Sequence, residues 1–123
     1  MIGHIDFEDL NIYVSQEPVN MWKSFDALAV LVQESIGKLP SAGDMFIFYN
    51  KTRNKVKILF WDGNGFVIYY KRFERNKFNI DQFQDNEGNI QLTIRDLRGL
   101  LVGTTMKHGR LKQWQPFEGK FIM

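Results

Sequence analysis

The chain has no cysteine, only three prolines and no long uninterrupted run of apolar residues. Without cysteine it can form neither a disulfide nor the thiolate ligands of a common structural zinc site. Charged residues interrupt every hydrophobic segment well short of the length that spans a membrane. Because no secretory leader is evident either, we expect a cytoplasmic protein with no membrane association.

Residues that hold metals or cofactors are also scarce. The two histidines, His4 and His108, are isolated from each other and from any cluster of ligands. The glycines at 63 and 65 precede a predicted strand, and no Lys-Ser or Lys-Thr pair follows them at the spacing of a phosphate-binding loop. We therefore expect no metal, no cofactor and no enzymatic activity.

Aromatic side chains are abundant, with eleven Phe and three Trp among 123 residues. The length suits one domain, and the many rings suggest a core built by aromatic packing. We expect a single domain over residues 1–123. Its core should cover about 10–103, and residues 104–123 form a tail to which the pattern assigns no structure.

The most strongly patterned stretch, residues 45–73, predicts a three-stranded antiparallel meander with strands at MFIFYN, KVKILFW and FVIYYKRF. Between the last two strands, a structural turn is expected at Asp62, Gly63, Asn64 and Gly65, in which Asp, Gly and Asn supply the residues with positive φ. The predicted fold class is α+β: a mostly antiparallel sheet around this meander, packed against two short helices.

The first helix is predicted over residues 25–36. Ser24 is a natural N-cap, Gly37 is a natural stop, and the apolar residues between them recur at helical spacing. Before it, residues 10–14 alternate like a half-buried strand.

The second helix is predicted to begin after Thr93, which forms a variant capping box with Asp96, and to end at Gly103. Residues 90–92 favour a short strand just before it.

Hairpin loops of even length sort the meander's side chains onto two faces. One face is nearly all apolar and includes Ile58 and Phe60, so we expect the helix over residues 25–36 to cover it. The other face includes Lys57 and Leu59; it is apolar near Gly63 and basic at the opposite end.

Charge is distributed unevenly. Residues 1–49 hold two basic and seven acidic side chains, a net charge of −5, whereas residues 50–123 hold 14 basic and seven acidic ones, a net charge of +7. In an antiparallel meander the first turn and the exit of the third strand lie at the same end. Six cations converge there, and we call this set the basic end: Lys51, Arg53, Lys55, Lys57, Arg72 and Arg75.

The basic end is a candidate DNA contact, because contact with phosphates needs positive charge but no geometry that reads bases. An ordinary solvated surface is the alternative, and the sequence leaves both open. Trp61 and Phe66 could form an aromatic platform on which bases stack, although a cross-strand pair that holds the hairpin is the favoured interpretation.

Acidic side chains offer weaker alternatives. Asp62 could bind a metal, but its side chain is also favoured in such a turn. An acidic triad of Asp26, Asp62 and Glu74 could be imagined for two-metal phosphoryl chemistry. Helix capping and surface pairing explain Asp26 and Glu74 better.

Three stretches, residues 23–29, 59–66 and 70–75, resemble in the same order the TnpB-type accessory protein of bacterial transposons of the insertion-sequence-sixty-six family. The similarity spans about residues 14–103. The resemblance implies a non-enzymatic protein that is encoded beside a separate transposase and supports transposition. One departure from the family's usual Asp-Met-Arg-Lys-Ser is that this chain reads Asn20-Met21-Trp22-Lys23-Ser24.

Two function classes follow. The first is a transposition accessory that touches DNA weakly, and without sequence preference, through the basic end. The second is a protein-interaction module that binds the transposase of the same element, or another of its products, through acidic residues 6–17 or the aromatic tail. Salt-dependent DNA binding would distinguish the first from the second.

Overall fold

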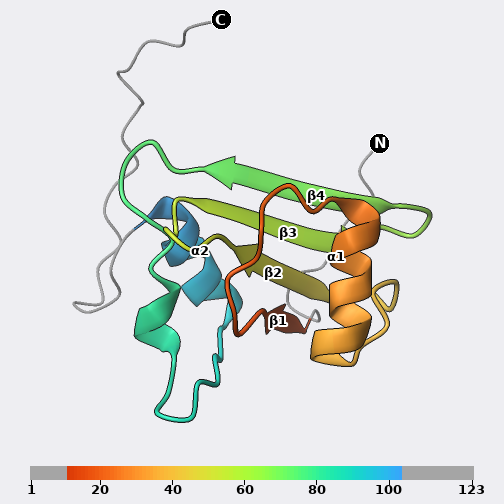
Figure 1. Ribbon diagram of the computed structural model, residues 1–123, viewed down its shortest axis with the longest axis horizontal. Coiled ribbons are helices and arrows are strands. Elements are labelled where there is room, and N and C mark those ends of the chain that lie inside the picture. The colour runs from red at the N-terminus through yellow and green to blue at the C-terminus, as the bar shows by residue number, and fades with distance from the viewer. Residues whose placement is uncertain (1–10, 104–123) are drawn as a thin grey trace, which may run out of the picture.

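The computed structural model describes residues 11–103 (Figure 1). Its strands form one four-stranded sheet in the order β1-β2-β3-β4. The α+β class predicted from the sequence is confirmed. The elements in chain order are β1 Ile12–Val14, α1 Phe25–Leu31, the π-helical turn η1 Val32–Ile36, β2 Met45–Tyr49, β3 Lys55–Trp61, β4 Phe66–Arg72, the 3-10 turn η2 Ile80–Phe83 and α2 Ile94–Val102.

The central meander is antiparallel, as predicted. Tyr49 pairs with Val56 across β2 and β3, and Trp61 pairs with Phe66 across β3 and β4. Residues 50–55 and 62–65 join these pairs, so both connections contain an even number of residues. The predicted division of the meander into two faces is therefore confirmed.

The prediction of which face the first helix covers was wrong. Leu28 of α1 packs with Phe46, Phe48 and Leu59, on the face opposite Ile58. The Ile58 face is covered instead by side chains from α2 and η2, including Leu97, Leu100 and Ile80. The sheet is thus enclosed from both sides, with α1 and α2 on opposite faces (Figure 1).

The cause of this arrangement is the parallel pairing of β1 with β2. A parallel pair needs a crossover connection, and here that crossover contains α1, which packs on one face. The later part of the chain covers the other face. The sequence carried a signal of this, because all five residues of β2 are buried, and a strand covered on both sides reads as a continuous apolar run.

The predicted helix over residues 25–36 forms, but its second half is the π-helical turn η1. Gly37 closes it in the left-handed conformation, as expected. Ser24 is the N-cap, although its side chain makes no capping hydrogen bond. Phe25, predicted for the buried stripe, is 45% exposed.

The capping box of the second helix is present. Asp96 N–H donates to Thr93 Oγ1 at 3.1 Å, and Thr93 N–H donates to Asp96 Oδ2 at 3.0 Å. The helix α2 ends at Gly103. The strand predicted at residues 90–92 is reduced to one isolated bridge between Gln84 and Ile90.

Candidate nucleic-acid interface

The β2–β3 turn and the exit of β4 lie together, as the meander topology predicts. Phe73 N–H donates to the carbonyl oxygen of Asn54 at 2.7 Å, and Phe78 N–H donates to that of Arg53 at 2.8 Å. Lys55 and Arg72 are paired across β3 and β4. These main-chain contacts fix five members of the basic end in one region: Lys51, Arg53, Lys55, Arg72 and Arg75.

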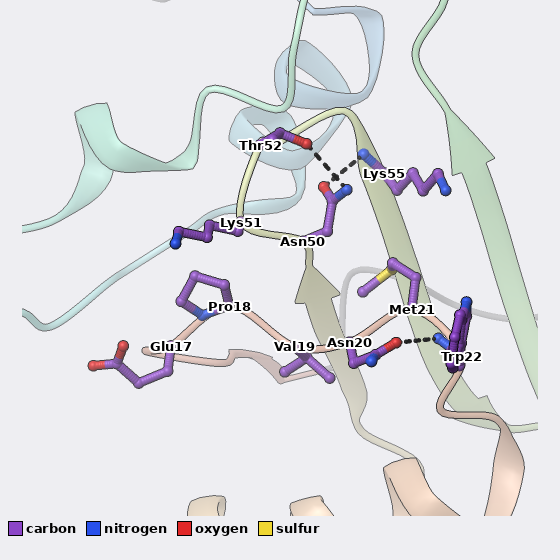
Figure 2. Close-up of a pocket in the computed structure, with 10 residues that line it drawn as sticks. All are labelled: Glu17, Pro18, Val19, Asn20, Met21, Trp22, Asn50, Lys51, Thr52 and Lys55. Atoms are coloured by element: carbon purple, nitrogen blue, oxygen red, sulfur yellow. Dashed lines mark hydrogen bonds between the residues drawn. The ribbon is translucent and has the colours of Figure 1, made fainter.

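A network around Asn50 shapes the β2–β3 turn. Its Oδ1 accepts from Lys55 N–H at 2.9 Å, and its Nδ2 donates to Asn54 Oδ1 at 2.6 Å. The side chains of Lys51 and Lys55 leave this turn toward opposite sides (Figure 2). A turn tied together in this way holds the two lysine backbones at a fixed separation.

Lys57 does not belong to the exposed part of the basic end. Its side chain is buried, and its Nζ donates to the carbonyl oxygens of Met21 and Lys23, both at 2.7 Å. The ammonium also lies 4.6 Å from the ring centroid of Tyr70. Burial lowers the pKa of Lys57. Its role in the fold is to tie the loop before α1 to the sheet.

Two of the arginines are already paired. Arg53 Nη2 lies 2.9 Å from Asp81 Oδ1, and its guanidinium stacks over Tyr49 at 5.0 Å from the ring centroid. Arg72 Nε lies 2.6 Å from Glu74 Oε1, but both side chains are well exposed. Exposed ion pairs contribute only about 0–1 kcal/mol, so Arg72 can exchange its partner easily while Arg53 is held more firmly.

The ammonium groups of Lys51 and Lys55 make no hydrogen bond or ion pair with any side chain or backbone group of the described region. Lys51 is exposed and Lys55 is partly exposed. Arg75 is also exposed. Lys51, Arg72 and Arg75 are thus the exposed members of the basic end, and Lys55 is partly exposed.

Trp61 and Phe66 contact each other. Their ring centroids lie 5.0 Å apart with the planes at 76°, an edge-to-face arrangement. They sit at the hairpin end of β3, separated from Lys55 by the length of the strand, roughly 20 Å at the usual rise per residue. This geometry suits a pair that holds the hairpin, and it places the predicted platform far from the basic end.

The structural turn at 62–65 is closed by Asp62 N–H, which donates to the Gly65 carbonyl oxygen at 3.1 Å. Gly63 has φ of 105°, while Asp62, Asn64 and Gly65 all avoid positive φ. The expectation that several of these residues adopt positive φ was therefore wrong, and Gly63 alone requires it.

The acidic triad does not assemble, because Asp62 and Glu74 lie beyond opposite ends of β4. Between residues 11 and 103, no group of three or more acidic or histidine side chains is placed to hold a metal ion. The same region has no helix long and apolar enough to cross a membrane.

Sequence reasoning missed a groove between the β1–α1 loop and the β2–β3 turn, which we call the Trp22 groove (Figure 2). Its volume is about 680 Å³. Trp22, on its rim, is 91% exposed. A tryptophan in a polar connecting segment was the available signal. The lining residues are Glu17, Pro18, Val19, Asn20, Met21, Trp22, Asn50, Lys51, Thr52 and Lys55.

Comparisons with known proteins agree with the resemblance found in the sequence. The sequence model of the family described as IS66 Orf2 like protein matches residues 10–110. Two similar proteins come from Sinorhizobium fredii (strain NBRC 101917 / NGR234). Uncharacterized protein y4jC is 28% identical over 76% of this chain and 79% of its own, and uncharacterized protein y4hO is 26% identical over 89% and 92%. No solved structure matches significantly.

Proposed function

Because the chain belongs to the IS66 Orf2-like family, we propose that it supports transposition through weak, sequence-tolerant contact with DNA at its basic end. The family makes it a transposition-associated accessory protein. The contact with DNA is our own addition. The observation that carries it is that Lys51, which is exposed, and Lys55, which is partly exposed, have no ionic or hydrogen-bonding partner for their ammonium groups within residues 11–103, on a turn fixed by hydrogen bonds.

The arrangement suits phosphates better than bases. Lysine ammonium groups act as point charges, and neutralising phosphates releases counterions whatever the sequence. Arg72 adds a second kind of donor, since its weak surface pair with Glu74 can open toward a phosphate. By contrast, α1 carries no cation, and α2 carries only the two arginines Arg95 and Arg98, a short set for a helix that reads base edges in the major groove.

The test is equilibrium binding of the purified protein to two duplexes of unrelated sequence over a series of salt concentrations. We expect weak binding that is equal for both duplexes and falls steeply as salt rises, with a slope of about 0.9 per neutralised phosphate. A clear preference for one duplex would contradict the sequence-tolerant contact. If the protein binds neither duplex even at low salt, the proposed contact with DNA is wrong.

A protein-interaction module is the second candidate, and β4 is the feature that favours it. This strand is at the edge of the sheet, with β3 as its only neighbour among residues 11–103. Tyr69 and Tyr70 on it are 43% and 50% exposed. An edge strand with exposed aromatic residues can pair with a strand of a partner, for which we propose the transposase of the same element.

Co-purification with the transposase encoded beside this chain, with and without DNA of the element's ends, separates the two candidates. Capture that needs DNA supports the DNA contact, whereas capture without DNA supports the protein module. The acidic residues 6–10 and the aromatic tail, which the sequence analysis also considered as partner surfaces, lie outside the described residues.

A further inference from the structure

Trp22 is an unusual side chain to leave uncovered. A tryptophan has a large apolar surface, and at 91% exposure it contributes almost nothing to the core. Its neighbour Met21, by contrast, is buried with Leu28 and Phe46. Met21 therefore anchors the loop to the core, while the indole of Trp22 points to solvent.

The backbone that carries the indole is held on both sides. Trp22 N–H donates to Asn20 Oδ1 at 2.8 Å, and Lys23 N–H donates to the Asn20 carbonyl oxygen at 3.2 Å. The buried ammonium of Lys57 binds the carbonyl oxygens immediately before and after Trp22. An aromatic ring presented on a fixed backbone loses little further chain entropy when a ligand binds to it.

The charged residues that line the groove are mostly positive. Lys55 and Lys51 line the same groove, and the acidic side chain among its lining residues is Glu17. In Figure 2, Glu17 and Trp22 lie at opposite ends of the groove, with the β2–β3 turn between them. A ligand that stacks on Trp22 and extends past Lys55 toward Lys51 meets the two cations before it reaches the carboxylate.

We propose that the Trp22 groove binds a short single-stranded segment of DNA, with one unpaired base stacked on Trp22, a phosphate at that end of the groove contacted by Lys55, and a phosphate further along the strand contacted by Lys51. Proteins that bind single strands combine an aromatic ring, on which any base can stack, with a groove of positive charge. A duplex offers the lysines the same phosphates but hides its base faces from the indole. The groove thus prefers unpaired DNA. This inference rests on the proposed DNA contact of Lys51 and Lys55 and adds to it a preference of the Trp22 groove for single strands.

The test is anisotropy titration of a short labelled oligothymidylate and of a duplex of equal charge with wild type, Trp22→Ala and Trp22→Phe. Because one stacked base contributes roughly a five- to hundredfold gain in affinity, Trp22→Ala should lose about that factor on the single strand. Trp22→Phe should recover part of it, and duplex affinity should be unchanged. Leu39→Ala is the control, since Leu39 is 60% exposed and does not line the groove.

The outcomes separate this inference from the broader proposal. Equal single-strand affinity in wild type and Trp22→Ala overturns the stacking site, while salt-dependent duplex binding would still support the basic end. An equal loss of affinity for single strand and duplex in Trp22→Ala also overturns the stacking site. The indole would then affect DNA binding only by supporting the structure of its loop. If Trp22→Ala keeps DNA binding and loses capture of the transposase, the groove is a protein site. A Trp22-dependent single-strand complex without duplex binding supports this site and contradicts the duplex contact.

Discussion

The Nζ atom of Lys57 on β3 donates a hydrogen bond of 2.7 Å to the carbonyl oxygen of Met21, in the loop before α1. A second bond of the same length reaches Lys23. Lys57 therefore has a structural role, although its place in the sequence suggested a surface cation. The same ammonium supports the backbone on both sides of Trp22.

Replacement of Lys57 by Met shortens the side chain by one heavy atom, the Nζ that makes both hydrogen bonds, and keeps an unbranched chain up to that point. Two carbonyl groups then lose their partner, and an unsatisfied buried polar group costs about 1–3 kcal/mol. We expect the free energy of unfolding in urea to fall by about 2 kcal/mol, partly offset because a buried charge is also removed. Lys55→Met is the control, because Lys55 lies two residues away on the same face of β3. This change should alter stability by less than about 0.5 kcal/mol. Equal stability of both variants would contradict the structural role of the hydrogen bonds from Lys57 to the loop before α1.

The structure separates two glycines that the sequence treats alike. Gly63 has φ of 105°, a conformation that a β-branched residue adopts only under strain, whereas Gly65 is outside that region and has open space around its Cα. Gly63→Val should destabilise the protein by more than about 1 kcal/mol, and by clearly more than Gly65→Val.

Asp62→Asn should change stability little, because the bond that closes this turn comes from the main chain of Asp62. Thermal melts of the three variants measure the order of these effects. If Asp62→Asn keeps stability but abolishes support of transposition, the turn has a functional role in addition to a structural one.

Tyr49 makes the stability depend on pH in the alkaline range. Its hydroxyl donates to the Gln16 carbonyl oxygen at 3.1 Å, and burial raises the pKa of Tyr49 above the ordinary value of about 10. In the unfolded chain the phenol ionises first, so the contribution of Tyr49 is complete below about pH 10 and is lost as the pH rises beyond it.

Urea unfolding of wild type and Tyr49→Phe at pH 8 and pH 11 tests this linkage. At pH 8 the wild type should be more stable by about 1 kcal/mol, the usual worth of one hydrogen bond. At pH 11 this advantage should shrink. Comparison with Tyr49→Phe cancels the titration of buried lysines such as Lys57, which both proteins share. If the difference in the free energy of unfolding between wild type and Tyr49→Phe stays constant or grows from pH 8 to pH 11, burial does not raise the pKa of Tyr49.

The sequence was enough to predict the meander and its two faces, since strand alternation and even hairpin loops are local properties. It was not enough to decide which helix covers which face. That depends on the parallel pairing of Met45 with Ile12, a contact between segments far apart in the chain. The continuous apolar run of β2 held the clue that both faces are covered.

For the candidate site, too, the sequence predicted one part and not the other. Topology brought the basic end together, as expected from the meander. The burial of Lys57 could not be predicted from the sequence. Its hydrogen-bond acceptors are main-chain carbonyl oxygens of a loop that lies more than thirty residues earlier in the chain. Arg53 likewise finds its partner Asp81 in η2, a segment for which the sequence predicted no helix or strand. Trp22 was visible in the sequence as a tryptophan in a polar connecting segment and as a departure from the family's usual residue, but its exposure was not.

The central claim is that Lys51 and Lys55, at the basic end, carry the contact with DNA. It is tested most directly by the salt dependence of duplex binding for Lys51→Ser/Lys55→Ser, compared with Lys38→Ser/Arg95→Ser, which removes the same charge from exposed residues elsewhere. We predict that the slope of log K against log salt falls by about two for the first pair of changes and stays near the wild-type value for the second. Equal slopes for the two double variants would contradict the claim.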